Sequence, residues 1–208
     1  MIQMAEDAKN NPPHFTNAGF DIVAIAASAG GLTAQIKVLS TLPAEFPAAI
    51  AIVQHISPEH PSFMAEILNR RTDITVKQAK EGDDLTPGTA YIAPPNRHLL
   101  VNDDGTLSLS QSKLVHFLRP SADLLFESVA ATYKERAIAI VLTGTGSDGA
   151  MGVEAIKKMG GTVIVQDVKT AEFSGMPSAA IQTGNVDFIL PLDEISRVLV
   201  SLVMGECN

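Results

Sequence analysis

Cysteine is nearly absent from this chain, which has one in 208 residues, Cys207. A single cysteine excludes an intrachain disulfide bond and a cysteine-based metal cluster. The five histidines are scattered, and none has the His-x-x-x-His spacing of a helical zinc site. We therefore expect no metal ion and no other cofactor, and the cysteine usage favours a cytoplasmic location.

Long apolar runs and basic clusters are missing as well. No apolar stretch reaches the ~18 residues of a membrane-spanning helix, so we expect no direct membrane insertion. The net charge is -8, the pI is about 5.0, and the longest basic runs are the pairs Arg70-Arg71 and Lys157-Lys158. This charge argues against nucleic acid as a partner.

One folded domain accounts for most of the chain. A length of 208 residues with 46% hydrophobic residues is sufficient for a single domain with a sizeable core. The first 18 residues lack the basic start and apolar centre of a secretory signal. We predict a loose N-terminal leader over residues 1–18 and the folded domain over residues 19–204.

Apolar runs alternate with segments of helical spacing along this domain. Seven runs are predicted as strands, at residues 21–27, 49–54, 74–79, 90–93, 137–143, 162–166 and 186–190. Helices are predicted after the first two strands, over about residues 121–133 and 149–159, and near the C-terminus, with Ser57-Pro58 and Ser121 as N-terminal caps. The helix after residues 49–54 is predicted to carry Phe63, Met64, Ile67 and Leu68. Residues 98–102 and 106–110, which flank Asp104-Gly105, are predicted as a β-hairpin. The alternation favours an α/β fold with a mostly parallel sheet and helices on both faces.

Three polar residues follow predicted strands: Ser28, His55 and Asp148. Because ligands bind beyond the carboxyl ends of parallel strands, the three side chains can meet at one edge of the sheet. A hydroxyl, an imidazole and a carboxylate are the components of a nucleophilic hydrolase. Each residue also has a structural alternative, since Ser28 and Asp148 could be helix N-caps and His55 a half-buried histidine.

Two glycine-rich turns leave a nucleotide-binding domain as another alternative. The turns are Gly30-Gly31 and the segment 144–149, and either could bring backbone N–H groups close to a phosphate. The second turn lacks the lysine of a P-loop, and its Gly-x-Gly-x-x-Gly spacing is a weak dinucleotide signal on its own.

The sequence also resembles a known family, the catalytic domain of chemotaxis protein-glutamate methylesterases of the CheB type. The resemblance spans about residues 22–200. It is carried by six motifs in the family's order: Ile25-Ala26-Ala27-Ser28-Ala29-Gly30-Gly31, Gln54-His55, Ala93-Pro94-Pro95-Asn96-Arg97-His98, Arg119-Pro120-Ser121-Ala122-Asp123, the segment 143–150 and Phe173-Ser174-Gly175-Met176-Pro177.

The resemblance implies a doubly wound, three-layer αβα sandwich whose residues 19–204 form the catalytic domain. It implies Ser28 as nucleophile, His55 as base and Asp148 as the residue that orients the imidazole, acting through an acyl-enzyme. The implied substrates are methylated glutamates on the cytoplasmic helices of chemoreceptors. Candidates for oxyanion or substrate binding are Ala29, Gly30, Gly31, Thr145, Gly146 and Met176.

Three residues beside the site depart from the family's usual motifs: Ala26, Ala29 and Thr145 stand where Gly, Thr and Met are usual. These departures leave a catalytically impaired sensory or scaffold protein as a further alternative. The usual enzyme carries a receiver domain before the catalytic domain, and the short leader predicts none here. We therefore expect activity that is constitutive or controlled by a separate receiver or methyltransferase protein.

Overall fold

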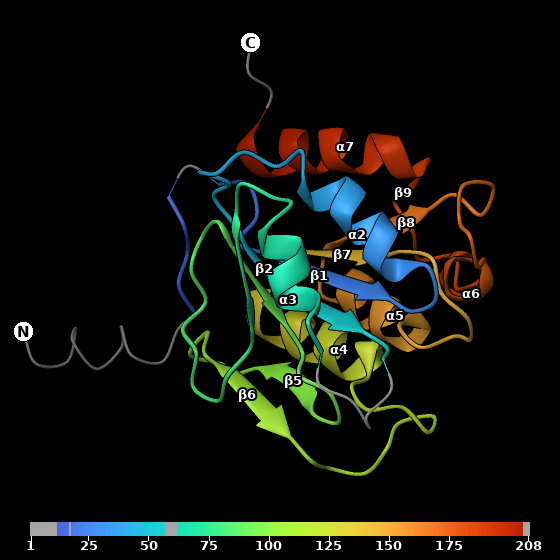
Figure 1. Ribbon diagram of the computed structural model, residues 1–208, viewed down its shortest axis with the longest axis horizontal. Coiled ribbons are helices and arrows are strands. Elements are labelled where there is room, and N and C mark those ends of the chain that lie inside the picture. The colour runs from blue at the N-terminus through green and yellow to red at the C-terminus, as the bar shows by residue number, and fades with distance from the viewer. Residues whose placement is uncertain (1–11, 17, 57–61, 206–208) are drawn as a thin grey trace, which may run out of the picture.

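The computed structural model describes residues 12–16, 18–56 and 62–205, and it has three layers with a parallel sheet in the middle (Figure 1). The sheet has seven strands in the order β3-β4-β2-β1-β7-β8-β9, and every pairing in it is parallel. Its strands are β1 (Ile22–Ala27), β2 (Ala49–Gln54), β3 (Thr75–Gln78), β4 (Thr89–Ile92), β7 (Ala137–Val141), β8 (Thr162–Gln166) and β9 (Phe188–Leu190). The predicted hairpin is the separate antiparallel pair β5 (His98–Val101) and β6 (Leu107–Ser110). The predicted fold class is confirmed.

Helices cover both faces of the sheet. One face packs against α2 (Gly31–Leu39), α3 (Met64–Asn69) and α7 (Leu192–Met204). The other face packs against α4 (Ala122–Tyr133), α5 (Ala150–Lys158), α6 (Gly175–Gln182) and the hairpin, and a short 3₁₀ helix, η1 (Lys134–Arg136), follows α4. Strand β1 lies at the centre of the sheet, with β2, β4 and β3 on one side and β7, β8 and β9 on the other.

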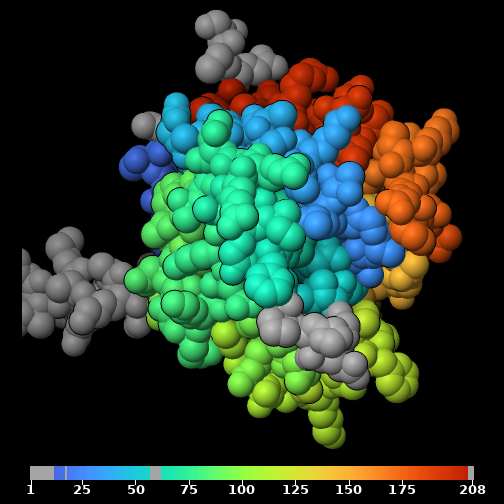
Figure 2. Space-filling model, viewed as in Figure 1, coloured from blue at the N-terminus to red at the C-terminus, as the bar shows by residue number. Residues whose placement is uncertain are grey.

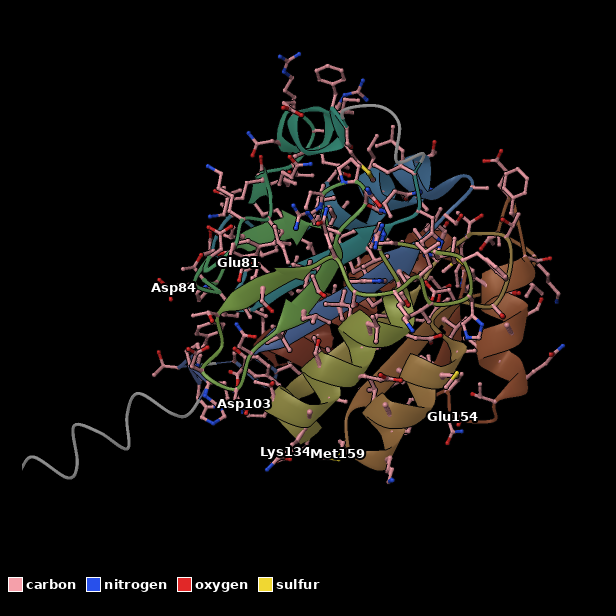
Figure 3. All side chains as sticks on the ribbon, turned by 90° about the horizontal axis from the view of Figure 1, so that it is seen from below. Glu81, Asp84, Asp103, Lys134, Glu154 and Met159 are labelled. Atoms are coloured by element: carbon pink, nitrogen blue, oxygen red, sulfur yellow. The ribbon has the colours of Figure 1, made fainter. Side chains whose placement is uncertain are left out.

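The two faces of the central strands differ in side-chain size. The face under α2 and α7 carries mainly Ile and Val, such as Ile25 on β1, whereas the face under α4 and α5 carries many alanines, such as Ala24 and Ala26. Figure 3 shows α4 and α5 side by side with Lys134 and Met159 at neighbouring ends. A Cβ added at Gly152 of α5 would lie 2.5 Å from the Cβ of Phe126 on α4, so these helices approach closely.

Some local predictions differ from the structure. Of the four apolar residues predicted in the helix after β2, Met64 and Leu68 are buried, but Phe63 and Ile67 are 68% and 38% exposed. Helix α3 has only six residues, and Phe63 lies before its first turn. Its predicted cap, Ser57-Pro58, lies outside the described residues, as does Cys207. Helix α6 was not predicted, since it is short and begins with a Gly-Met-Pro sequence that resembles a turn.

A buried carboxylate fixes the start of the domain. Asp21 has no exposed surface, and its carboxylate accepts hydrogen bonds from the guanidinium of Arg136, from His14 Nδ1 at 2.7 Å and from the Phe15 N–H at 2.9 Å. Burial alone would raise the pKa of Asp21, but the bonds from Arg136 and His14 outweigh it and lower that pKa. Part of the predicted leader thus contacts the domain, and the boundary at residue 19 stays a prediction.

Within the described ranges, no helix has the length and apolar character needed to cross a membrane. The same part of the chain holds no group of three or more His, Cys, Asp or Glu residues arranged to bind a metal ion.

Candidate active site

Ser28 lies in a tight turn between β1 and α2 at the centre of the sheet. Its N–H donates to the carbonyl of Thr143 at 3.0 Å, and its own carbonyl accepts from the Gly31 N–H at 2.9 Å. The N-cap of α2 is Gly30, which has a φ of 75°, a left-handed conformation that favours glycine. Ser28 is therefore not the helix cap, and that structural alternative is wrong.

His55 follows β2, the strand beside β1, and sits next to Ser28. The His55 N–H donates to the carbonyl of Ala27 at 3.0 Å, which extends the β1–β2 pairing beyond Ala27 and Gln54. The amide nitrogen of Gln54 donates to both the Ser28 carbonyl at 2.7 Å and the His55 carbonyl at 3.0 Å. One side chain thus ties together the backbones of the predicted nucleophile and the predicted base.

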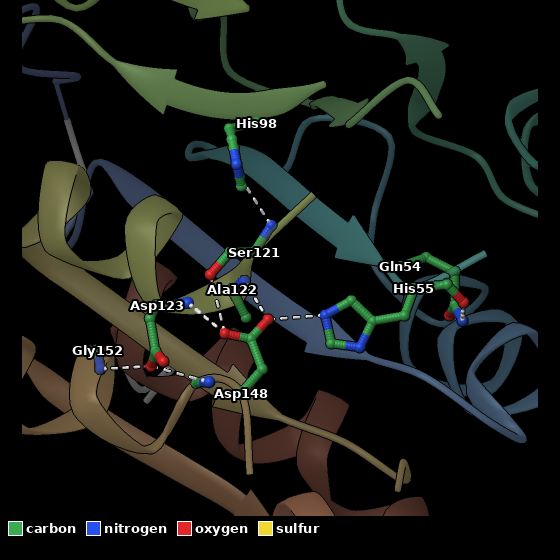
Figure 4. Close-up of polar contacts among 9 residues, drawn as sticks. Gln54, His55, His98, Ser121, Ala122, Asp123, Asp148 and Gly152 are labelled. Atoms are coloured by element: carbon green, nitrogen blue, oxygen red, sulfur yellow. Dashed lines mark hydrogen bonds and ion pairs between the residues drawn. The ribbon is translucent and has the colours of Figure 1, made fainter. Parts of the chain in front are cut away.

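The imidazole of His55 faces Asp148, which comes from the loop after β7. His55 Nε2 and Asp148 Oδ2 are 2.7 Å apart, and the two side chains are only 9% and 1% exposed (Figure 4). Because Nε2 faces the carboxylate, Nδ1 is the ring nitrogen that does not contact Asp148. Among the described residues, Ser28 Oγ makes no hydrogen bond with the His55 ring, although the two residues follow adjacent strands.

Asp148 is held at the N-terminus of α4. Its carboxylate accepts from Ser121 Oγ at 2.9 Å, the Ala122 N–H at 2.6 Å and the Asp123 N–H at 3.2 Å (Figure 4). Burial alone would raise the pKa of Asp148, but the hydrogen bonds from His55 and Ala122 outweigh it and lower that pKa. Asp148 therefore stays ionised, as a residue that orients an imidazole must be.

Two predictions about helix caps are corrected here. Asp148 is not the N-cap of α5, which is Gly149, and its carboxylate caps α4 instead. Ser121 is the N-cap residue of α4 as predicted, but its hydroxyl makes no capping bond to its own helix and donates to Asp148. The carboxylate takes the position at the helix N-terminus because an anion is the stronger acceptor for free N–H groups.

Asp123, in the first turn of α4, caps the N-terminus of α5 with its carboxylate. Its carboxylate accepts from the N–H groups of Gly149 at 2.9 Å and Gly152 at 2.8 Å. Burial raises the pKa of Asp123 to about 6, the Gly152 N–H opposes the rise, and the charge of Asp148 adds to it. Each helix start is therefore capped by a carboxylate from the other: Asp148, just before α5, caps α4, and Asp123 of α4 caps α5.

His98 belongs to the same network, although the sequence predicted it only as the first residue of a hairpin strand. Its Nδ1 accepts from the Ser121 N–H at 3.2 Å (Figure 4). Its Nε2 donates to the carbonyl of Lys113 at 3.2 Å. Burial lowers the pKa of His98, which keeps the ring neutral. The motif Ala93–His98 was a signal for this residue, but its role depends on contacts between the hairpin and α4.

The other side of the Ser28 turn is formed by Thr143, Gly144 and Met176. Thr143 Oγ1 bonds to the carbonyl of Ala29 at 3.1 Å and to the backbone of Phe173. A Cβ added at Gly144 would lie 2.3 Å from Met176 Sδ and 2.8 Å from the Cβ of Ser28. Glycine is therefore required at position 144, and Met176 is buried close to the serine.

The six candidates for oxyanion or substrate binding separate into two groups. The N–H groups of Gly31 and Met176 already donate, to the carbonyls of Ser28 and Gly144. The remaining four make no backbone N–H hydrogen bond to another described residue; they are Ala29, Gly30, Thr145 and Gly146. These four N–H groups are the ones available to a substrate oxygen.

The glycine-rich turns are poorly suited to a nucleotide phosphate. The N-termini of α4 and α5 are already occupied by the carboxylates of Asp148 and Asp123. At the N-terminus of α2, the carboxylate oxygen Oε2 of Glu172 lies 2.8 Å from the position a Cβ would take on Gly30. A phosphate at any of the three helix starts would therefore meet a negative charge.

The fold and the site indicate the class of protein. It is a three-layer α/β domain with an imidazole–carboxylate pair, of the kind found in hydrolases, at the carboxyl edge of its parallel sheet. The chain belongs to the CheB methylesterase family, a family of hydrolases, whose model matches residues 23–199.

Individual relatives agree with this assignment. A Leptospira interrogans protein, provisionally named a protein-glutamate methylesterase/protein-glutamine glutaminase, is 41% identical over 88% of this chain and 95% of its own length. Protein-glutamate methylesterase FrzG of Myxococcus xanthus is 39% identical over 97% of this chain and 58% of its own length. The crystal structure of the Thermotoga maritima CheB methylesterase catalytic domain matches with a TM-score of 0.85 and 37% identity, over 88% of this chain and 99% of that one.

Proposed function

We propose that the chain is a protein-glutamate methylesterase that uses Ser28, His55 and Asp148 as a catalytic triad. The observation that carries the proposal is the buried His55–Asp148 pair, 2.7 Å apart, beside a serine on the adjacent strand end. The names of the relatives support glutamyl methyl esters as the substrate.

In the proposed reaction, Ser28 Oγ attacks the ester carbonyl carbon and its proton passes to His55 Nδ1. The tetrahedral intermediate collapses, the bond to the methoxy oxygen breaks, and the proton on Nδ1 passes to that oxygen to release methanol. Water then attacks the acyl-enzyme and gives a proton to Nδ1. That proton returns to Ser28 Oγ as the glutamate carboxylate leaves, so no cofactor is needed.

Asp148 fixes which ring nitrogen is the base. Because its carboxylate accepts from Nε2–H, the lone pair of His55 is on Nδ1, which leaves that nitrogen as the base. The imidazolium that forms during each half-reaction is stabilised by the same carboxylate. Free N–H groups of Ala29, Gly30, Thr145 or Gly146 hold the oxyanion, at roughly 3–4 kcal/mol for a well-placed donor.

The proposed substrates are methylated glutamates on the cytoplasmic helices of chemoreceptors, and the proposed regulators are a separate receiver or methyltransferase protein. Both proposals rest on membership of the CheB methylesterase family. The intact His55–Asp148 pair supports an active enzyme over the alternative of an inactive scaffold, because a buried carboxylate paired with an imidazole beside a serine is the arrangement that a catalytic triad requires.

The first test measures methanol released from a chemoreceptor cytoplasmic fragment that carries labelled methyl esters. We expect Ser28→Ala and His55→Ala to lower turnover by ~10⁴-fold or more, because either change removes a member of the triad. Ser201→Ala is the control, since this serine is exposed on α7, and it should keep wild-type turnover. Wild-type activity in Ser28→Ala would exclude the proposed nucleophile.

A further inference from the structure

Residues 111–119, between β6 and α4, form a hairpin-like projection that we call the finger. Val115 and Leu118 exchange both backbone hydrogen bonds, at 3.1 and 2.8 Å, around a two-residue turn. The turn residues His116 and Phe117 have φ values of 49° and 65°. Two consecutive left-handed residues that are not glycine make a strained turn, and such strain concentrates at functional sites.

The tip of the finger exposes large apolar side chains. Phe117 is 93% exposed and Leu114 is 51% exposed. Neither contributes to the hydrophobic cores on the two faces of the sheet. In Figure 1, the lime-green chain after β6 runs along the lower side of the molecule and returns to α4 on the side where the arrowheads of β1 and β2 end. Figure 2 shows the lime-green atoms at the lower surface.

The base of the finger is fixed to the active site. The guanidinium of Arg119 donates to the carbonyls of Ser112 at 2.7 Å and Gln111 at 3.1 Å, and to Asn96 Oδ1 at 2.9 Å. The Lys113 carbonyl accepts from His98, which in turn accepts from the Ser121 N–H beside Asp148. The strained tip is therefore presented at a set position relative to the triad.

Other exposed apolar residues border the same edge of the sheet. Leu32, Phe63 and Phe173 are 36%, 68% and 39% exposed. Each lies in the segment that leaves the carboxyl end of a strand, β1, β2 and β8 respectively. An apolar border around a polar site is typical of a surface that binds a protein rather than a small molecule.

The charge of the finger is opposite to that of the chain. Residues 105–122 contain Lys113 and Arg119 and no Asp or Glu, although the net charge of the whole chain is -8. Among the described residues, neither cation forms an ion pair with a carboxylate. A partner that fits this surface has an apolar face with carboxylates beside it.

We propose that the finger is the docking element for the protein substrate, an acidic protein segment with an apolar face. Phe117 and Leu114 pack on the apolar face, while Lys113 and Arg119 lie opposite the carboxylates, so that the glutamyl ester reaches Ser28. This inference rests on the proposed function, which supplies the identity of the substrate.

The experiment separates docking from chemistry. Docking is measured as the Kd of Ser28→Ala, with and without Phe117→Ala, for an esterified chemoreceptor cytoplasmic fragment, by calorimetry. Chemistry is measured as kcat/KM of the single variant Phe117→Ala, with Ser28 intact, on N-acetylglutamate γ-methyl ester, which lacks the protein surface that would dock on the finger. Ile189→Ala is the matched control, because Ile189 is 49% exposed on the edge strand β9. Phe117→Leu tests whether an apolar tip is sufficient.

We expect Phe117→Ala to weaken binding of the fragment by roughly 10- to 100-fold, the loss typical of a buried aromatic anchor. Turnover of the small ester should stay within about twofold, Ile189→Ala should change neither quantity, and Phe117→Leu should recover most of the binding. An unchanged Kd in Phe117→Ala would overturn the docking role, as would an equal loss on both substrates. If the wild type left the small ester intact, the proposed function would fail, while the Kd values would still decide the role of the finger.

Discussion

At the scale of single residues, the site contains two buried carboxyl groups whose pKa values move in opposite directions. The pKa of Asp148 is lowered and that of Asp123 is raised to about 6, although both are close to the same two helix starts. Burial acts to raise both pKa values, but the hydrogen bonds from His55 and Ala122 outweigh it at Asp148, whereas the charge of Asp148 adds to it at Asp123. Asp148 therefore keeps its charge, and Asp123 takes up a proton more readily.

Asp123 gives a prediction for stability against pH. Its folded-state pKa of about 6 lies above the ordinary value of 3.8, so its stabilising contribution is fully present below about pH 4 and is lost as the pH rises through about 6. Asp123→Asn stays neutral and keeps an oxygen for Gly149 and Gly152. We expect it to exceed the wild type in free energy of unfolding by about 2–3 kcal/mol at pH 7, with no advantage at pH 4.

The matched variant is Asp123→Ala, which removes the acceptor as well as the charge. We expect it to lose about 1–3 kcal/mol relative to Asp123→Asn at every pH, because two N–H groups at the start of α5 lose their partner. Urea unfolding at several pH values measures both variants. A difference between wild type and Asp123→Asn that stays constant from pH 4 to pH 7 would contradict the raised pKa of Asp123.

The individual site residues differ in how far the sequence predicts them. Ser28, His55 and Asp148 each follow an apolar run, so strand periodicity alone places them at one edge of a parallel sheet. Asp123 and His98 lie inside predicted elements, and their roles depend on the distance between α4, α5 and the hairpin. That distance follows from side-chain packing, which local periodicity does not contain.

At the scale of secondary-structure elements, the turn from β1 into α2 depends on one amide side chain. Gln54, at the end of β2, donates to the carbonyls of Ser28 and His55, and its own oxygen accepts from Gln35 of α2 at 2.9 Å. A Cβ on Gly31 would lie 2.1 Å from that oxygen and 2.8 Å from the Cβ of Ala27. The glycine therefore makes room for the amide that joins the two strand ends.

We expect Gly31→Ala to displace Gln54, to destabilise the fold by about 1–3 kcal/mol through overpacking, and to lower kcat by at least about 10-fold through misplacement of Ser28 and His55. A double-mutant cycle with Gln54→Ala checks the cause. In the Gln54→Ala background, Gly31→Ala should lower the free energy of unfolding and kcat much less than it does in the wild type. Equal losses in both backgrounds would show that Gln54 is not what the new Cβ meets.

Among the elements, the strands of the parallel sheet and the hairpin follow from the sequence, whereas α6 and the exposed face of α3 do not. The central strands are continuous apolar runs, a pattern that suits a sheet covered on both faces. Helices α3 and α6 have six and eight residues, too short for the apolar spacing to identify the buried side.

At the scale of the whole molecule, stability depends on an ion pair between two residues that are far apart in the sequence. Asp21, at the start of β1, is fully buried against the guanidinium of Arg136, which precedes β7. The pair joins the first central strand to its neighbour at the edge opposite the triad. His14 also bonds to Asp21, but its side chain is 61% exposed.

We expect Arg136→Ala to lower the free energy of unfolding by about 3 kcal/mol or more, because a buried carboxylate loses its charge partner. His14→Ala is the control and should cost less than about 1 kcal/mol, since that partner is mostly in solvent. Urea unfolding at pH 7 measures both. A larger loss in His14→Ala than in Arg136→Ala would contradict this ranking of the two contacts.

The exchanged carboxylates of α4 and α5 have a consequence for local unfolding. Fraying the start of α4 releases Asp123, which leaves α5 without its acceptor, and fraying the start of α5 moves Asp148 away from α4. We therefore expect the two helix starts to open together, with their amide hydrogens exchanging with solvent as one cooperative unit.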